Sequence, residues 1–476
     1  MNKRDFPKIH FYDQDFVDIY DKTWAWVQDV WKRSPGGEIA ENDYFVYPQE
    51  DQTVVDQTES VFSSFFLVYS NRNFPAHQNL DYLYERQEES GAIRQKYLLK
   101  DNSPVFDEKN PEGVGLPLFA WAEYNLYHKL ANKRRIREVM PTLQKYFDWI
   151  DANFKKSNSL YAAPVEASTM FNSPRTNTVY PVDFNSAMAI NALYMAALGD
   201  ILNDKDLNFQ YKRIYFSLKT RINALMWDSH RGLYCDLDAN EKKLPHKTLA
   251  SFWPLLAEIP NEDKAEQLIL YLAKPEAFGT DHPFASLAAD EKEFSVDGEG
   301  FRGSVFPAFN FMVIKGLEKY QRYDLAREAS IRHLYYILDG ISPEGSEKGG
   351  DLWDAYLPTK EGPAKLSGDE NFPRKRNLAF AGLSTIAIMI ENIVGFNISL
   401  PRKTVDWTIP NLETMGIENL SLKRNMITVL SNKTIRGWEI QMESEKLYYF
   451  TINILGEKKK TIPIPSGKCS MLIDKL

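Results

Sequence analysis

The chain has 476 residues, of which 43% are hydrophobic and 26% are charged, and its formal net charge is −8. This balance excludes large-scale disorder and is typical of a globular protein with a sizeable core. No basic run is longer than the three residues 458–460, which is too short to neutralise a phosphate backbone, so nucleic acid is not an expected partner.

The first sixteen residues carry charges that no apolar stretch follows, which is not the pattern of a secretory signal. No window of about 18 apolar residues predicts a membrane span, so we expect a cytoplasmic chain without membrane contact. The two cysteines, Cys235 and Cys469, fall in regions assigned to different domains, which predicts neither a disulfide framework nor a cysteine metal site.

Between Asp13 and Val394 the apolar residues recur mainly at spacings of three and four, which predicts helices. Pro141 falls near the start of one segment and Gly395 follows another, as expected for helix ends. The segments have the number that six helical hairpins require. They are 13–33, 58–70, 77–89, 116–132, 136–154, 184–202, 207–227, 247–256, 261–273, 304–320, 323–338 and 377–394.

Four of the connections between these helices are long and rich in polar and aromatic residues: 91–115, 155–183, 274–303 and 339–376. Long ordered loops on a helical scaffold usually carry function, so we expect the site there.

After Gly395 the pattern changes to short alternating runs at 404–409, 426–430 and 447–452, which predict strands. We therefore expect a helical domain over 1–395 and a small β-sandwich-like domain over 396–476. The second domain has no catalytic constellation of its own, and its expected role is to brace the first.

Eight motifs succeed one another in the helical part. They are TESVF (58–62), LDYLYERQEESG (80–91), FAWAE (119–123), STMFNSPR (168–175), KTLASFWP (247–254), the segment from His282-Pro283 to Asp290, FRGSVFP (301–307) and LWDAY (352–356). In order and spacing they resemble the bacterial relatives of glycoside hydrolase family 63, the trehalase and mannosylglycerate hydrolase group. The likeness covers nearly the whole chain, and it implies an all-α (α/α)6 barrel of the six-hairpin glycosidase type.

The resemblance also implies an inverting mechanism, in which a carboxylic acid protonates the leaving oxygen and a carboxylate across the ring activates water. The family's acid is the Asp of a pattern like S-G-M-D-N-S-P-R, where this chain has Phe171. A phenyl ring cannot deliver a proton. The family's base is the Glu of L-W-E-N-Y, where Asp354 keeps the charge on a shorter side chain.

Other differences from the family fall where it meets its sugar. The usual W-D-T start is Thr58-Glu59-Ser60 here, and Phe301 and Phe306 stand in place of two tryptophans. Arg302, between small neighbours, is expected to reach into the pocket and donate to hydroxyls or a carboxylate. The full set of expected substrate contacts is Glu59, Gln87, Trp121, Phe171, Asn172, Arg175, Trp253, Phe301, Arg302, Trp353 and Tyr356.

Two carboxylates flank the lost acid position, Glu166 before Phe171 and Asp183 after it, and either could supply the proton. Glu59, Asp297 and Glu299 are further possibilities. For each of them the alternative is a solvated or helix-capping carboxylate, and for Asp354 it is an Asp that caps a loop turn.

Cofactor patterns are lacking in the sequence. His77, His246 and His282 have no His or Cys at metal-ligand spacing, and there is neither a P-loop pattern nor a G-x-G-x-x-G after a strand. We therefore expect no metal and no nucleotide cofactor.

Two functions remain open. The first is an α-glycosidase acting on a small glycoside or oligosaccharide, with Asp354 as base and an altered acid. The second is a non-catalytic carbohydrate-binding protein that keeps the cleft but has lost protonation of the leaving group. A scaffold that binds protein through the outer face has no positive signal.

Overall fold

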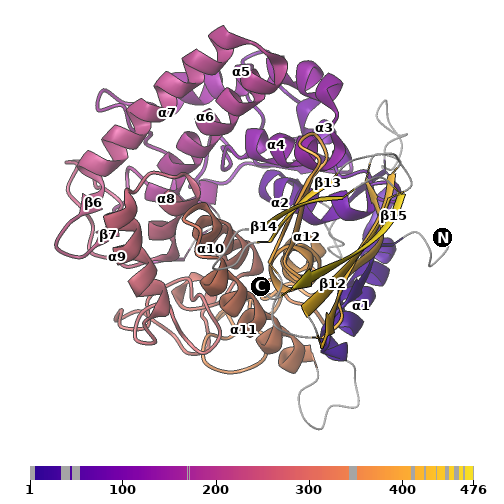
Figure 1. The fold of residues 1–476 in the computed structure, drawn as a ribbon. Helices are drawn as coiled ribbons and strands as arrows, with labels where there is room; N and C mark the ends of the chain where they lie inside the picture. The colour runs from indigo at the N-terminus through magenta and orange to yellow at the C-terminus, as the bar shows by residue number, and fades with distance from the viewer. Residues whose placement is uncertain are drawn as a thin grey trace.

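The computed structural model describes residues 6–33, 43–45, 54–168, 170, 172–341, 351–408, 413–422, 425–435, 437–444, 450–454, 460–464 and 467–474. Its main body is a closed barrel of helices, viewed along its axis in Figure 1, and a β domain covers one end. All twelve predicted helices are confirmed within these residues, with ends shifted by a few positions. The expected (α/α)6 barrel with a C-terminal β domain is therefore confirmed.

The barrel has an inner ring in which each helix contacts the next and the last returns to the first. Its members are α2 (Gln57–Leu67), α4 (Phe119–Leu130), α6 (Val182–Leu202), the 3-10 turn η4 (Leu249–Phe252) with α8 (Trp253–Leu256), α10 (Pro307–Lys319), and α12 (Leu378–Gly382) continued by the π-helix η6 (Leu383–Ile393). The outer ring consists of α1 (Gln14–Val30), α3 (Gln78–Tyr84), α5 (Lys133–Phe154), α7 (Lys205–Leu225), α9 (Glu262–Ala273) and α11 (Tyr323–Ile341).

Burial separates the two rings. Helix α6 is apolar almost all round and most of its side chains are buried, as expected of a helix enclosed by neighbours. Helix α5 buries one stripe, from Ile136 to Phe154, and exposes charged residues on its other face. Among the described residues, none of the helices has an apolar stretch long enough to span a bilayer.

The β domain contains two sheets. One has the order β1-β10-β11-β12-β15 and the other β14-β13-β9-β8. The strands are β1 (Lys8–His10), β8 (Phe396–Ser399), β9 (Thr404–Trp407), β10 (Met415–Leu422), β11 (Asn425–Thr434), β12 (Gly437–Ser444), β13 (Phe450–Ile454), β14 (Lys460–Ile464) and β15 (Gly467–Asp474). Strand β1 lies in the segment that we assigned to the barrel, yet it pairs antiparallel with β10, Ile9 opposite Ile417.

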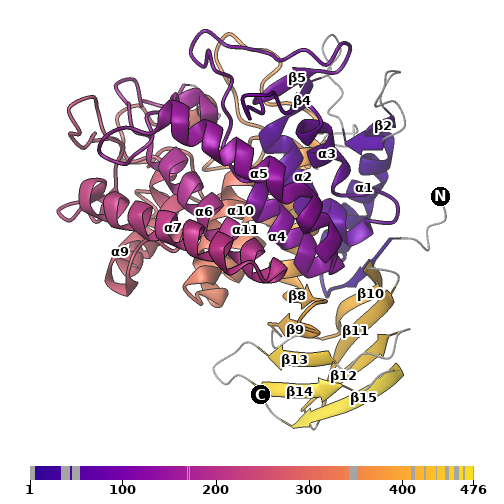
Figure 2. The same cartoon turned by 90° about the horizontal axis from the view of Figure 1, so that it is seen from above.

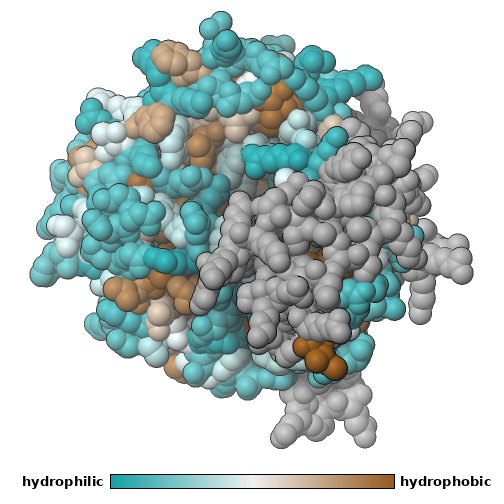
Figure 3. Space-filling view, viewed as in Figure 1, coloured by the Kyte–Doolittle hydropathy of each residue, from teal (hydrophilic) through white to brown (hydrophobic). Residues whose placement is uncertain are grey.

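Direct hydrogen bonds join the β domain to the barrel. The Leu400 N–H donates to the His128 carbonyl (2.8 Å), and Lys129 Nζ donates to Asn397 Oδ1 (2.8 Å). Trp407 Nε1 donates to the Val394 carbonyl at the end of η6. On the face seen in Figure 3, which is the face of this domain, the described surface is mostly hydrophilic and its apolar side chains form small separate groups.

Short strands of two or three residues pair within the connections of the barrel. They are β2 (Trp31–Arg33) with β3 (Asp43–Phe45), β4 (Val54–Asp56) with β5 (Lys96–Leu98), and β6 (Trp227–Asp228) with β7 (Leu233–Tyr234). Figure 2 shows β4 and β5 at the end of the barrel opposite to the β domain.

Candidate active site

A cavity of about 510 Å³ lies at the barrel end that carries β4 and β5. All four long connections singled out in the sequence contribute to its wall, as do the N-terminal turns of α2, α10 and α12. The volume falls within the range of about 300–1,000 Å³ found for small-molecule sites.

Two carboxylates on this wall share one cation. Arg374 donates from Nη1 to Glu59 Oε1 (2.7 Å) and from Nε to Asp354 Oδ2 (2.7 Å). Asn377 Nδ2 donates to the same Glu59 oxygen (3.1 Å). Burial lowers the pKa of Arg374, but the two carboxylates outweigh this effect and raise the pKa above its usual value. The guanidinium is therefore permanently charged and holds both carboxylates in place.

The start of α2 supplies further polar groups. Asp56 caps the helix, since its Oδ1 accepts from the N–H groups of Thr58 (2.7 Å) and Glu59 (3.0 Å). Burial raises the pKa of Asp56, opposed in part by Lys96. The Thr58 hydroxyl is buried and has no hydrogen-bond partner among the described residues, although Thr58 lines the cavity.

An aromatic surface lines the same cavity. Phe301 and Phe306 stack with ring centroids 4.3 Å apart, and Phe309 packs against both. Phe372 follows at 6.3 Å from Phe306. Phe301 and Phe306 thus both line the cavity and give this part of its wall an apolar surface.

Glu166 lines the same cavity from the 3-10 turn Val165–Ser168. Its backbone carbonyl accepts from Gln95 Nε2 (3.2 Å), which ties the turn to the segment before β5. In the described part of the chain its carboxylate takes part in no ion pair.

Asp183, the other candidate acid, is held in a buried clamp. Arg175 donates to both of its oxygens at 2.8 Å and also to both oxygens of Asp236. Burial would raise the pKa of Asp183, but Arg175 outweighs it and holds the pKa below its usual range. Neither Asp183 nor Arg175 lines the cavity. This clamp fixes the connection between Ser168 and α6, and a carboxylate of depressed pKa is a poor proton donor.

Arg302 was expected to reach into the pocket, but it does not line the cavity. Arg302 is exposed, and its Nε donates to the Asn172 carbonyl (3.1 Å). In the tight turn Gly300–Arg302 consecutive side chains diverge, and Phe301 takes the inward place. Asn172 holds this turn in place, since its Oδ1 accepts a hydrogen bond from the Phe301 N–H. The contact requires a glycine at position 300, because a Cβ there would lie only 2.7 Å from Asn172 Oδ1.

Besides Arg302 and Arg175, six expected contacts lie outside the cavity lining: Gln87, Trp121, Asn172, Trp253, Trp353 and Tyr356. Gln87 donates to the carbonyls of Gly91 and Thr142, and Trp253 is buried in the core. Trp121 lines a separate cavity of about 240 Å³ beside the β domain. The Trp353 N–H donates to the buried Tyr356 hydroxyl, which shapes the loop that carries Asp354.

The three remaining candidates are Phe171, Asp297 and Glu299. Phe171 lies outside the described residues. Asp297 stands 4.0 Å from Lys360 and Lys365, and Glu299 accepts from the Ser367 N–H and hydroxyl; neither lines the cavity.

Sequence reasoning missed Arg374 and Asp56. Arg374 stands in the short basic run 374–376 of a long loop, which gives no indication that it joins two distant carboxylates. Asp56 had a readable signal, because an Asp before a helical segment is a common N-cap.

Comparisons with known proteins agree with this architecture. The family model for the mannosylglycerate hydrolase MGH1-like glycoside hydrolase domain matches residues 73–340, and the model for the trehalase C-terminal domain matches residues 395–476. An uncharacterised protein of Borreliella burgdorferi is 52% identical over 481 residues, and the likeness covers both chains completely.

More distant likenesses are partial. A periplasmic trehalase of Escherichia coli is 26% identical over 98 residues, which covers 20% of this chain and 17% of the trehalase. The family 63 mannosylglycerate hydrolase of Thermus thermophilus, solved in complex with glucose, has the same fold with a TM-score of 0.61. Its sequence is 17% identical, and the likeness covers 78% of this chain and 98% of that one.

The helical barrel, its cavity lined by the long connections and the matched segment together identify the main body of the chain. It belongs to the mannosylglycerate hydrolase MGH1-like glycoside hydrolase family and carries a C-terminal domain of the trehalase type.

Proposed function

We propose that this chain is an inverting α-glycosidase that hydrolyses a small glycoside or oligosaccharide in the 510 Å³ cavity. The observation that carries the proposal is that two carboxylates from different connections, Asp354 and Glu166, line one cavity together with a stacked aromatic pair. Membership of a glycoside hydrolase family supports the same reaction class.

Asp354 is the proposed base. Its two oxygens are oriented by the Arg374 N–H and Nε, which leaves lone pairs that accept a proton from water. In the proposed reaction that water attacks the anomeric carbon, its proton passes to Asp354, and the bond to the leaving oxygen breaks.

Glu166 is the proposed acid that protonates the leaving oxygen. Two features favour it over Asp183: it lines the cavity, and its carboxylate forms no ion pair among the described residues. Asp183 lies beneath the site, bonded to Arg175.

The carboxylates and the aromatic surface of the cavity support a polyhydroxylated ligand. A sugar offers hydroxyl groups to the carboxylates and C–H groups to Phe301 and Phe306.

The test uses glycosyl fluorides of α configuration, whose leaving group needs little protonation. Under the proposal the protein releases fluoride and a sugar of inverted configuration, read by a fluoride electrode and by proton NMR. Retention of configuration would contradict the inverting mechanism.

A second candidate function is binding without catalysis, and the observation that favours it is Phe171 at the position of the family's acid. It predicts saturable binding of oligosaccharides by calorimetry and no release of fluoride from any α-glycosyl fluoride.

A further inference from the structure

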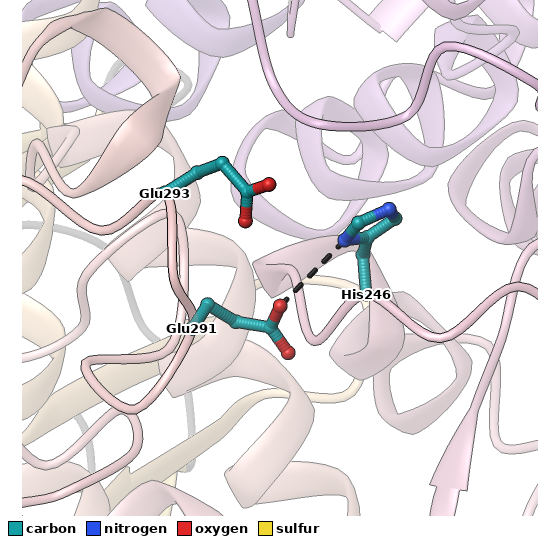
Figure 4. Close-up of side chains that lie close together, drawn as sticks. All are labelled: His246, Glu291 and Glu293. Carbon is teal, nitrogen blue, oxygen red and sulfur yellow. Dashed lines mark ion pairs between the residues drawn. The ribbon is translucent and has the colours of Figure 1, made fainter.

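Away from the cavity, the segment before η4 and the loop before η5 (Gly300–Arg302) run side by side. The Leu249 N–H donates to the Ser286 carbonyl (2.9 Å), and the Ala288 N–H donates to the Lys247 carbonyl (3.0 Å). This pairing brings His246 beside a turn of the second loop that carries Glu291 and Glu293, as Figure 4 shows.

The three side chains converge in a way that suits a metal ion. One ligand atom from each lies within 4.8 Å of the other two. His246 Nδ1 stands 3.6 Å from Glu291 Oε2, beyond hydrogen-bonding distance. This distance is close to about 3.4 Å, the separation between two ligand atoms in a tetrahedral site with metal–ligand bonds of about 2.1 Å.

An independent observation concerns the imidazole nitrogen itself. The His246 side chain is 30% exposed, but its Nδ1 atom is shielded from solvent and has no hydrogen-bond partner among the described residues. Buried polar atoms are nearly always paired, and an unpaired one needs an ion, a water molecule or another partner. Here it points towards two carboxylates (Figure 4).

The surroundings hold this arrangement ready. The Lys247 N–H donates to Glu291 Oε1 (3.1 Å), so the other oxygen of that carboxylate faces His246. Lys247 Nζ pairs with Asp290, and among the described residues it forms no ion pair with Glu291 or Glu293. One neutral imidazole and two carboxylates form a donor set of charge −2, which matches a divalent cation.

We propose that His246, Glu291 and Glu293 bind one divalent transition-metal ion of the zinc class. The ion joins the segment before η4 to the loop that continues to Phe301 on the cavity wall. None of the three ligands lines that cavity, so the proposal does not depend on the chemistry assigned there.

The experiment uses the full chain, freed of metal by a chelator and dialysed, and titrated with zinc chloride by calorimetry. We expect one saturable site and a rise in Tm with zinc. The variant His246→Ala/Glu291→Gln is expected to weaken Kd by at least about 100-fold. The matched control His230→Ala/Glu276→Gln changes one exposed His and one exposed Glu elsewhere and should bind as the parent does.

Cobalt(II) provides a second readout. Four-coordinate cobalt with nitrogen and oxygen ligands absorbs visible light more strongly than the hydrated ion, and this absorption should appear in the parent and in the control. Absence of saturable zinc binding, or equal affinity in the parent and in the His246→Ala/Glu291→Gln variant, would overturn the proposal.

Discussion

The Asp354 carboxylate accepts a hydrogen bond from Arg374 at each of its oxygens: the Arg374 backbone N–H donates to one (2.8 Å), and its Nε donates to the other (2.7 Å). Backbone and side chain of one residue thus fix the plane of a carboxylate that stands on the cavity wall. A general base needs such a fixed orientation towards the water it activates.

Replacement of Asp354 with Asn is expected to abolish hydrolysis of α-glycosyl fluorides while the fold remains intact. The amide keeps the shape but cannot take a proton, so kcat should fall by about 10²- to 10⁴-fold or more. Fluoride release and circular dichroism measure the two effects. Asp206→Asn, at an exposed position of α7 outside the cavity lining, is the control; full activity of the Asp354 variant would show that the base lies elsewhere.

Glu166→Gln separates the acid from the base. We expect the variant to cleave unactivated disaccharides about 10²- to 10⁴-fold more slowly, because the leaving alkoxide goes unprotonated. Its kcat on glycosyl fluorides should stay within about threefold of the parent for the same reason. Glu89→Gln, at an exposed position, is the control. An equal loss on both substrate types would argue against Glu166 as the acid.

Removal of the shared cation should lower the rate of hydrolysis. In Arg374→Met the carboxylates of Glu59 and Asp354 lose their common partner, and Asp354 loses the Nε–H that fixes one of its oxygens. The kcat for α-glycosyl fluorides is therefore expected to fall by about tenfold or more. Arg374→Lys keeps a charge but not the two-pronged geometry, and it should restore the rate only in part. An unchanged kcat in Arg374→Met would contradict a positioning role for Arg374.

The charges on the cavity wall predict which glycosides are accepted. Six carboxylates line it, those of Asp56, Glu59, Asp107, Glu166, Asp354 and Asp369, against the cations Lys96 and Arg374. A neutral or basic glycoside should therefore have a kcat/KM at least about tenfold above that of a matched glycoside with a carboxylate, such as a D-glycerate glycoside. Faster cleavage of the acidic member of the pair would contradict this.

The clamp around Arg175 predicts a pH-dependent contribution to stability. Asp183→Asn is expected to lower the free energy of unfolding by about 3–5 kcal/mol at neutral pH, because it breaks a buried ion pair. The pKa of Asp183 is lowered in the folded chain, so its contribution is fully present above the ordinary value near about 4. This contribution to the free energy of unfolding is lost as the pH falls through the lowered pKa of Asp183 in the folded chain.

Denaturant unfolding at several pH values tests this, with the exposed Asp29→Asn as control. The difference between parent and Asp183→Asn should shrink below about pH 4. A difference that stays constant down to about pH 2 would contradict the assignment.

The sequence predicted the barrel well because helix burial is a local pattern. Apolar spacings of three and four follow from one buried stripe, and they located α5 and α7 within a few residues. The same pattern could not distinguish the π-helix 383–393 from an α-helix, since nearly every residue there is buried and no stripe marks the period.

The site was predictable only in part. Asp354 and Glu166 stand in two of the long connections where the sequence predicts the site, and both line the cavity. The role of Arg374 depends on three segments meeting in space, which no spacing records. Both Phe301 and Arg302 were expected at the site, but only Phe301 lines the cavity, because one tight turn decides which of two neighbours faces inward.

Strand β1 gives the molecule an unusual order of assembly. Residues 8–10 leave the ribosome long before their partner β10, which follows the whole ring of helices in the sequence. Strand β1 therefore cannot pair with β10 until the barrel helices have been synthesised. When the two strands pair, the segments before and after the ring of helices become parts of one sheet, which holds the two ends of the ring together.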